Sequence, residues 1–153
     1  MLKNVDIVVV ALSSPIVLGI YEDKKLIDTV TSEEKSSEIL PLIFQDLMQK
    51  YTIENLFYAN GPGSFMAIKV TYIFLKSLSI LKNIPLYARD AFYFNNNQPI
   101  KAIAKLYFVT ISSEIKTQKL ETIPSSSFFL HDVLEYAEFT KESTPIYGIG
   151  AVG

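Results

Sequence analysis

The chain has 153 residues, a formal charge of −2, 49% hydrophobic residues and 20% charged residues, a composition typical of one globular protein that buries its own core. An acidic chain of this kind lacks the basic surface with which nucleic-acid-binding proteins hold phosphates. It contains no cysteine and one histidine, which excludes disulfides, thiolate chemistry and a histidine-rich metal site.

Three strands are predicted in quick succession at the start of the chain. Ile7–Leu12 is a continuous apolar run, as expected of a strand buried on both faces, and Ile16–Tyr21 is a second strand. The charged residues 22–25 form a hairpin turn before a third strand, Leu26–Thr31. These strands are predicted to form a meander.

The uncharged run Ile7–Ile20 has the length of a signal-peptide core, but two strands explain it better. Asp6 stands at its head, residues 13–15 (Ser-Ser-Pro) interrupt it, and no small-residue cleavage site follows. No segment is long enough to span a membrane. We therefore expect a cytoplasmic protein.

A first helix is predicted from about residue 36 to residue 51, capped by Ser36 or Ser37. Pro41 falls about one turn in, where it costs little or leaves a bend. Apolar residues recur along this helix at intervals of three and four: Leu40, Ile43, Phe44, Leu47, Met48 and Tyr51. Ile39 and Leu42 widen the apolar arc, which suggests that more than one face is buried.

The next stretch reads as one βαβ unit with parallel strands and a right-handed crossover. It consists of a strand at Ile53–Ala59, a helix from Phe65 to about Leu81 and a strand at Ile84–Ala88. Between the first strand and the helix lies a tight turn made of Gly61, Pro62, Gly63 and Ser64, in which Ser64 can cap the helix.

The turn has two interpretations. Its amides lie at the carboxyl end of a strand, which favours an anion or partner site. The alternative is a strand-to-helix turn that only needs glycine. It is not a P-loop, because no Gly-Lys-Ser/Thr follows.

The helix at 65–81 is apolar almost all the way round, and its polar positions form only a narrow stripe at Lys69, Lys76 and Lys82 or Asn83. Because an ordinary surface helix has one apolar stripe and a wide polar face, this helix is predicted to be buried on two sides. One side can face the sheet. The other needs a cover, from the same chain or from another protein.

The second half of the chain carries weaker signals. The loop Asn95–Pro99 is the best candidate for a boundary, which divides the chain into residues 1–95 and a small degenerate unit at 96–153. The predicted elements around it are a helical turn at Asp90–Phe94, a strand at Ile100–Ile111, a polar edge strand at Ile115–Ile123, a helix at Phe128–Ala137 capped by Ser127, and a strand at Pro145–Val152.

Three segments in the first half resemble one family. Residues 60–70, NGPGSFMAIKV, are similar to the GPGSFTGLRIG signature of the TsaB (YeaZ) family. Residues 36–43 resemble that family's HSERLLPLI helix start, and residues 84–86 its IPL strand. The resemblance covers about residues 1–95 and is faint beyond residue 100. It implies an α/β fold: an actin-like, ribonuclease-H-like N-terminal half with a mixed sheet in the order β-β-β-α-β-α-β, and a reduced C-terminal α/β half.

The sequence departs from the family pattern at several places. Met66, Ala67, Lys69 and Thr71 stand where the family usually has Thr, Gly, Arg and Gly. Lys69 keeps the charge but not the bidentate fork of arginine, and the replaced glycines alter how closely helices can approach. The chain is also shorter than usual members of the family.

The motif positions of the enzymatic relatives are empty. Residues 10–14 contain no carboxylate where actin-like ATPases place one, and residues 35–42 contain no histidine where the catalytic relatives bind metal. A nucleophile at Ser64 has no base nearby, because His131 is predicted in a distant helix. Asp28, Asp46 and Asp90 are scattered. Residues 148–153 match G-x-G-x-x-G, but no helix follows to hold a pyrophosphate.

We therefore expect no catalytic residue, no metal and no cofactor. The resemblance implies a non-catalytic scaffold that binds and activates a TsaD-like subunit as a heterodimer in tRNA threonylcarbamoyladenosine synthesis, touching tRNA only indirectly. It leaves open whether a TsaE-like ATPase contacts this chain. The expected partner interface is Leu40, Ile43, Phe44, Leu47, Phe65, Ile68, Lys69, Tyr72, Leu75 and Lys76.

Two alternatives remain. One is a self-associating homodimer, which Lys69→Glu and Leu75→Glu should break without loss of tRNA modification. The other is a glycopeptidase-like or ATPase-like enzyme of the same superfamily.

Overall fold

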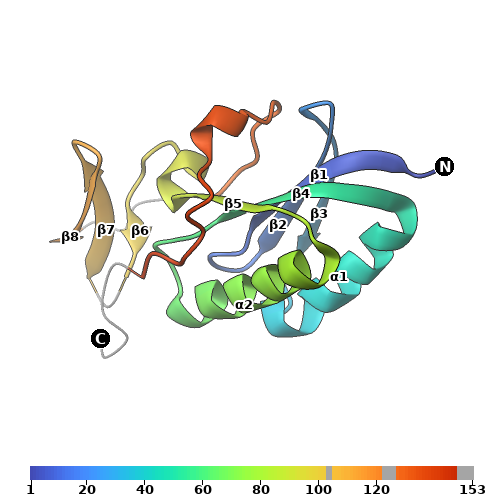
Figure 1. Cartoon of the computed structure of the whole chain (residues 1–153). Helices are drawn as coiled ribbons and strands as arrows, with labels where there is room; N and C mark the ends of the chain where they lie inside the picture. The colour runs from blue at the N-terminus through green and yellow to red at the C-terminus, as the bar shows by residue number, and fades with distance from the viewer. Residues whose placement is uncertain (103–104, 122–126, 148–153) are drawn as a thin grey trace.

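The computed structural model describes residues 1–102, 105–121 and 127–147. Its centre is a five-stranded mixed sheet in the order β3-β2-β1-β4-β5 (Figure 1). The elements are β1 (Lys3–Val10), β2 (Ile16–Glu22), β3 (Lys25–Ser32), α1 (Ser36–Lys50), β4 (Tyr51–Ala59), α2 (Phe65–Lys82) and β5 (Leu86–Arg89). The predicted order β-β-β-α-β-α-β is confirmed.

Strand directions follow the predicted connections. β1, β2 and β3 are joined by short turns and pair antiparallel. β4 pairs parallel with β1 and β5 pairs parallel with β4, because a helix returns the chain before each of them. The βαβ unit and the meander are therefore both confirmed, with strand ends displaced by a few residues from the predicted ones.

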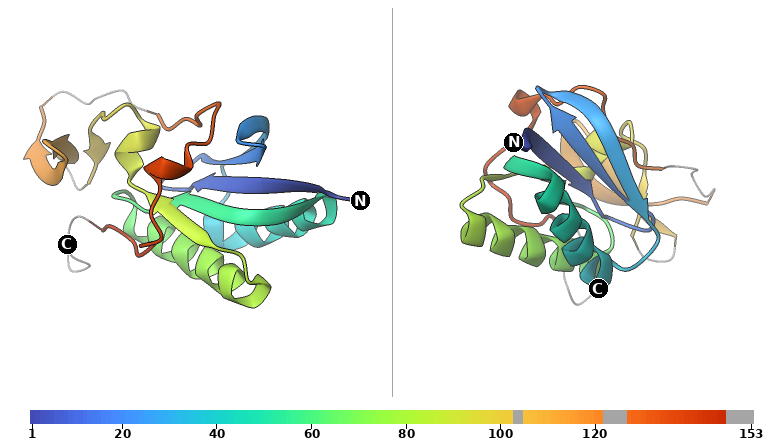
Figure 2. Two further views of the ribbon diagram at one scale, coloured as in Figure 1. Left: turned by 45° about the horizontal axis from the view of Figure 1, so that its top comes forward. Right: turned by 90° about the vertical axis from the view of Figure 1, so that its right-hand side faces the viewer.

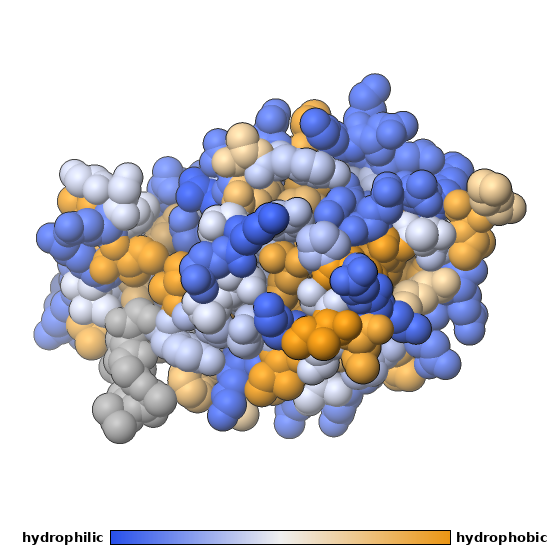
Figure 3. Space-filling model, viewed as in Figure 1, coloured by the Kyte–Doolittle hydropathy of each residue, from blue (hydrophilic) through white to orange (hydrophobic). Residues whose placement is uncertain are grey.

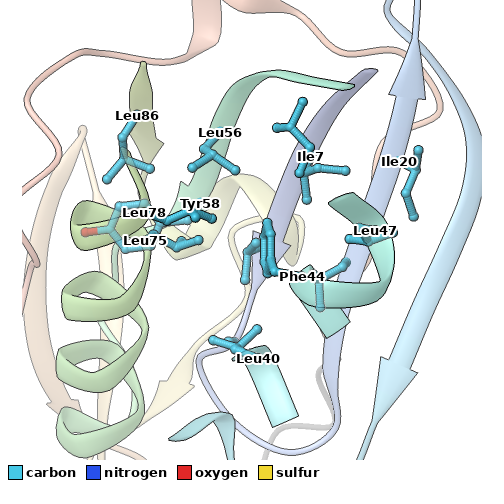
Figure 4. Packing of buried hydrophobic residues seen from close by; sticks show 14 of the residues in the cluster. Ile7, Ile20, Leu40, Phe44, Leu47, Leu56, Tyr58, Leu75, Leu78 and Leu86 are labelled. Atoms are coloured by element: carbon cyan, nitrogen blue, oxygen red, sulfur yellow. The ribbon is translucent and has the colours of Figure 1, made fainter. Parts of the chain in front are cut away.

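Both helices cover one face of the sheet (Figure 2), and their inward residues form a continuous core with the sheet. In α1 the buried residues are Ser36, Leu40, Phe44 and Leu47, and in α2 they are Ile68, Thr71, Leu75 and Leu78. Figure 4 shows Phe44, Leu47, Leu75 and Leu78 directed at side chains of β1, β4 and β5. The two helices also touch each other through the rings of Phe44 and Phe74, whose centroids lie 5.4 Å apart.

Two details of α1 differ from the prediction. The residue at the N-cap is Lys35, which makes no side-chain capping hydrogen bond, so neither Ser36 nor Ser37 is the cap. Tyr51 has extended backbone and begins β4 instead of ending the helix. The chain therefore passes from α1 into β4 without a loop.

A second, smaller sheet follows the 3-10 helix η1 (Ala91–Phe94), which is the predicted helical turn. It contains β6 (Ile100–Lys101), β7 (Leu106–Ile111) and β8 (Glu114–Lys119), paired antiparallel in that order. The prediction of one strand across residues 100–111 is wrong, because β6 and β7 run in opposite directions and pair with each other. Figure 1 places this sheet beyond the carboxyl ends of β1 and β4.

Residues 128–147, which we call the strap, first cross the face of the main sheet that the helices leave open (Figures 1 and 2). Beyond Thr140 at the β5 edge, the strap reaches Ser143, which contacts Tyr58 of the helix-side core. The helix predicted at residues 128–137 is wrong, since this segment contains no helix apart from the start of the short 3-10 helix η2 (Tyr136–Glu138). Phe128, Leu130, Leu134 and Phe139 pack from the strap into a second core. In that core they join sheet residues such as Val8, Val10 and Phe57.

The strap pairs with both edges of the main sheet. At the β3 edge, the Leu26 amide donates to the Asp132 carbonyl at 2.9 Å and the Leu134 amide donates to the Lys24 carbonyl at 2.8 Å. At the β5 edge, Ala88 and Thr140 exchange two hydrogen bonds of 2.8 and 2.9 Å. The strap therefore pairs with part of the backbone at both edges of the sheet. Free backbone groups on an edge strand promote association with other chains, and this pairing reduces their number.

The last predicted strand is only partly described. Pro145–Tyr147 is not assigned as strand, although the Ile146 amide donates to the Asn60 carbonyl at 2.7 Å. The rest of that strand and the glycine-containing segment 148–153 lie outside the described residues. The division at residue 95 stays a prediction.

Tyr58 holds the strap against the main sheet, because its hydroxyl donates a buried hydrogen bond to the Ser143 carbonyl. We expect Tyr58→Phe to lower the free energy of unfolding by about 1–2 kcal/mol, since it leaves a buried carbonyl without its donor. Urea denaturation followed by circular dichroism measures the loss. Tyr51→Phe is the control, because the structure shows no hydrogen bond for the half-buried Tyr51 hydroxyl within the described chain; an equal loss in both variants would contradict the assignment.

Candidate functional site

The turn between β4 and α2 is a packed junction of four segments. The Ala91 amide donates to the Gly61 carbonyl at 2.8 Å, and the Ser64 amide donates to the Leu12 carbonyl at 3.1 Å. Asn60 adds two hydrogen bonds to the strap, to the Thr144 carbonyl and from the Ile146 amide. These contacts support the structural interpretation of the turn.

Close approach of other backbone requires a glycine at position 61, whereas the contact at Gly63 is tight but can be relieved. Gly61 has φ +114°, and a Cβ placed there would lie 2.1 Å from the carbonyl oxygen of Ile146. A Cβ at Gly63 would lie 3.1 Å from Leu12. Gly61 and Pro62 are buried, whereas Ser64 is exposed and caps α2 by accepting from the Ala67 amide at 3.5 Å, as predicted.

A hollow of about 520 Å³ opens where the amino-terminal ends of α1 and α2 meet the β1–β2 turn. Five serines line it: Ser13, Ser14, Ser36, Ser37 and Ser64. Met66 and Val70 of α2 form part of its apolar wall, while Glu33, Glu34 and Lys35 bring charge of both signs. No sequence pattern marks this hollow, because its serines come from three separate segments and only their positions in the fold bring them together.

The candidate reactive groups do not converge. His131 belongs to the strap, where it stacks on Tyr93 with ring centroids 4.2 Å apart, and its Nε2 lies 2.8 Å from the Tyr93 carbonyl. Ser64 lies in the serine-lined hollow at the amino-terminal ends of α1 and α2. Within residues 1–102, 105–121 and 127–147, no group of three or more His, Cys, Asp or Glu side chains is placed to hold a metal ion.

The scattered carboxylates have local roles. Asp90 caps η1 by accepting from the Phe92 amide at 2.9 Å and pairs with Arg89. Asp46 pairs with Lys50, one helical turn later, at 3.1 Å. Asp28 is exposed on β3 and accepts from the Thr29 amide.

Five of the ten predicted interface residues point into the protein. Leu40, Phe44, Leu47, Ile68 and Leu75 are all buried in the cores that hold the helices on the sheet, so in this fold they are not surface contacts. Their apolar character is explained by the sheet alone. For the same reason, Leu75→Glu is a test of folding and not of self-association.

The other five predicted residues lie at or near the surface. Lys69 and Lys76 are exposed, and Ile43 is half-buried. Phe65 is half-buried against Tyr147, and Tyr72 is half-buried against Tyr58. These two rings face the strap and the sheet, so only their outer parts are accessible.

The exposed apolar surface of α2 is a different set of residues. Met66, Val70, Ile73, Ser77 and Ile80 follow one another at spacings of four, three, four and three, and we call them the outer seam. Met66 is 60% exposed, Ile73 53% and Ile80 69%. In Figure 3, hydrophobic side chains gather in a patch over α2. A stripe with this spacing is the geometry of a helix that pairs with another helix.

Two further residues extend this apolar surface. Leu81, next to the outer seam, is 80% exposed, and Leu42 on α1 is 60% exposed. Both faces of the sheet are already covered, one by the helices and one by the strap. The outer seam is therefore apolar surface that the described part of the chain leaves open. No helix in that part is long and apolar enough to cross a membrane.

No protein-family model and no curated protein matches the sequence. Among solved structures, the fold is similar to an uncharacterised Pseudomonas aeruginosa protein with similarity to peptidase YeaZ, with a TM-score of 0.58 and 10% identity over 80% of this chain and 70% of that one. YeaZ from Pseudomonas aeruginosa matches with a TM-score of 0.54 and 10% identity over 82% of this chain and 66% of that one. The chain therefore has a YeaZ-like fold and spans about two thirds of these proteins.

Proposed function

We propose that this chain is a divergent member of the TsaB (YeaZ) family, and that it is a non-catalytic scaffold subunit in the cytoplasm. Its partner is a TsaD-like threonylcarbamoyltransferase, which it binds and activates for the synthesis of threonylcarbamoyladenosine in tRNA. The YeaZ-like fold and the position of the GPGSF segment at the start of α2 support the family. The activity belongs to the partner, and this chain contributes the surface that holds it.

The observation that carries the proposal is the outer seam. Met66, Ile73 and Ile80 lie more than half exposed in one line on a helix whose opposite face is already packed on the sheet. Large apolar side chains that gather on one surface mark protein–protein contacts. With Leu81 next to it and Leu42 exposed on α1, the seam offers a helical surface on which a stable interface of the usual 1,200–2,000 Å² in total can be built.

The reactive groups support a scaffold over an enzyme. Ser64 and His131 lie in different parts of the fold. Of the three carboxylates singled out in the sequence, Asp90 caps η1 and pairs with Arg89, Asp46 pairs with Lys50, and Asp28 is an exposed acceptor on β3. General acid–base and nucleophilic catalysis both require such groups within hydrogen-bond reach of one another. The enzyme alternative therefore has less support than the scaffold.

Co-expression with the TsaD-like subunit of the same organism tests the proposal. We expect the two chains to co-elute in gel filtration, and Ile73→Glu to separate them, because a carboxylate in the middle of the outer seam would be desolvated in the complex. Ile111→Glu is the matched control: Ile111 is 50% exposed but lies on β7, away from α2.

Two results would contradict the proposal. The wild-type chains could elute as separate peaks, or Ile111→Glu could disrupt the complex as strongly as Ile73→Glu. Nucleoside analysis of tRNA after depletion of this protein provides the functional readout, with loss of threonylcarbamoyladenosine as the expected result. Unchanged modification would rule out the proposed role even if a complex forms.

A further inference from the structure

Two lysines stand at regular intervals beside the outer seam. Lys69 lies three residues after Met66 and four before Ile73, and Lys76 takes the same position between Ile73 and Ile80. Residues three and four apart are neighbours on a helix surface, so each lysine borders two seam residues. Both lysines are exposed. They border the same side of the seam and are separated by about 10.5 Å along the helix axis.

The charge around these lysines is one-sided. α2 contains no Asp or Glu, and neither Lys69 nor Lys76 has an ion pair among the described residues. The acid that faces Lys76 from the strap is Glu142, whose pKa is lowered mainly by hydrogen bonds from Thr144 and only slightly by Lys76. Glu142 is exposed and already accepts from the Thr144 hydroxyl at 2.6 Å. The positive charge beside the seam is therefore largely uncompensated within the fold.

We propose that the outer seam receives a helix of a different protein whose apolar stripe is bordered by Asp or Glu side chains opposite Lys69 and Lys76. This inference rests on the proposed function and specifies the chemistry of the partner's surface. In paired helices the apolar seam provides the contact, and charged residues flanking the seam select the partner and its orientation. The repeat of seven residues sets the carboxylates about two helical turns apart on the partner.

A second copy of this chain fits the seam less well. In an antiparallel two-fold pairing of α2 with itself, the side that carries Lys69 and Lys76 meets the same side of the copy, so like charges face each other. A parallel two-fold pairing brings the lysines beside α1 of the copy. There Asp46 is already paired with Lys50, and the exposed Glu38 lies close to Lys35, so α1 presents charges of both signs. The charges therefore favour a different, acidic partner.

Two synthetic amphipathic helices of about three heptads, used as probes of the purified chain, test the inference. They share the same Leu/Ile stripe and differ only in the flanking residues, which are all Glu in one and all Lys in the other. We expect the Glu-flanked helix to bind at least about tenfold more tightly by fluorescence anisotropy, a preference that shrinks at high salt because the lysines are exposed.

Charge reversal completes the test. Lys69→Glu with Lys76→Glu should reverse the preference between the two probes, because it places negative charge beside the seam. The fold should be retained, since Glu and Lys have similar helix propensity. Lys101→Glu with Lys119→Glu, two exposed positions on the second sheet, makes the same change in net charge and should leave the preference unaltered.

Three results would overturn the inference: equal binding of both probes, binding of neither, or a homodimer of the purified chain that the Glu-flanked helix does not displace. Because neither probe contains any TsaD-like sequence, these results are independent of the co-elution experiment. A complex that forms with the TsaD-like subunit while the probes show no charge preference would leave the scaffold role standing and remove only the acidic-partner specification.

Discussion

Replacing Gly61 with alanine is expected to lower the free energy of unfolding by at least about 3 kcal/mol. Gly61 has φ +114°, a conformation that side chains rarely adopt, and its added Cβ would lie 2.1 Å from the Ile146 carbonyl oxygen. Backbone cannot retract as a side chain can, so the strap must shift. That shift breaks the hydrogen bond between the Ile146 amide and the Asn60 carbonyl.

Gly63→Ala is the matched control for this prediction. Gly63 lies two residues away in the same turn, but its added Cβ would meet Leu12 at 3.1 Å, a contact that small adjustments relieve. We expect a loss well below that of Gly61→Ala in urea denaturation at 25 °C. Equal stability of Gly61→Ala and the wild type would contradict the close approach of the Ile146 carbonyl to Gly61.

The second large effect is expected from Leu75→Glu, which should unfold the protein or cost more than about 4 kcal/mol. Leu75 is fully buried between α2 and the sheet, where a carboxylate would lose its hydration and also leave the volume of leucine poorly filled. Thermal denaturation and the near-ultraviolet circular dichroism spectrum report whether packed tertiary structure survives.

Ile73→Glu places the same side chain two residues earlier on the same helix and serves as the control. Because Ile73 is 53% exposed on the outer seam, the glutamate remains hydrated, and we expect a melting temperature close to that of the wild type. If both variants unfold, or if both remain folded, then the assignment of inward and outward faces of α2 is incorrect. If only Leu75→Glu unfolds, Ile73→Glu is validated as a surface variant for the co-elution experiment.

The elements of the first half could be read from the sequence because local pattern and tertiary environment agree there. The run at Ile7–Leu12 indicated a strand buried on both faces, and β1 is covered by helices on one side and by the strap on the other. The glycine turn before Phe65 marked the start of α2 to the residue. Errors are confined to element ends, such as Tyr51, which belongs to a strand because β4 pairs with Lys3 there.

The strap could not be read, because long-range pairing decides its conformation. Leu130, Leu134 and Ala137 carry apolar groups at intervals of four and three, which also suit a helix. In the fold, Val133 bridges to Lys25 on one edge of the sheet, and these backbone hydrogen bonds require an extended chain. Propensity is a weak prior where tertiary contacts compete with it.

Which residues of α2 are exposed could not be predicted from the sequence for a similar reason. The apolar surplus of the helix at 65–81 was a sound indication, since the outer seam is exposed. Which residues face outward depends on how the helix is rotated about its axis against the sheet. Because apolar residues lie almost all the way round this helix, the sequence does not predict that rotation. The predicted interface includes Ile68 and Leu75, which are buried within the protein. It does not include Met66, Ile73 and Ile80, which are exposed.

The course of the strap has a consequence for the order in which the molecule can be completed during its synthesis. All five strands of the main sheet leave the ribosome before residue 128, yet Val8, Val10 and Phe57 gain part of their apolar cover from residues 128–139, which are made later. Nascent chains in which the strap has not yet been synthesised would expose this apolar surface of the sheet to chaperones and to each other. The native state is thus expected to form only after the strap has emerged from the ribosome.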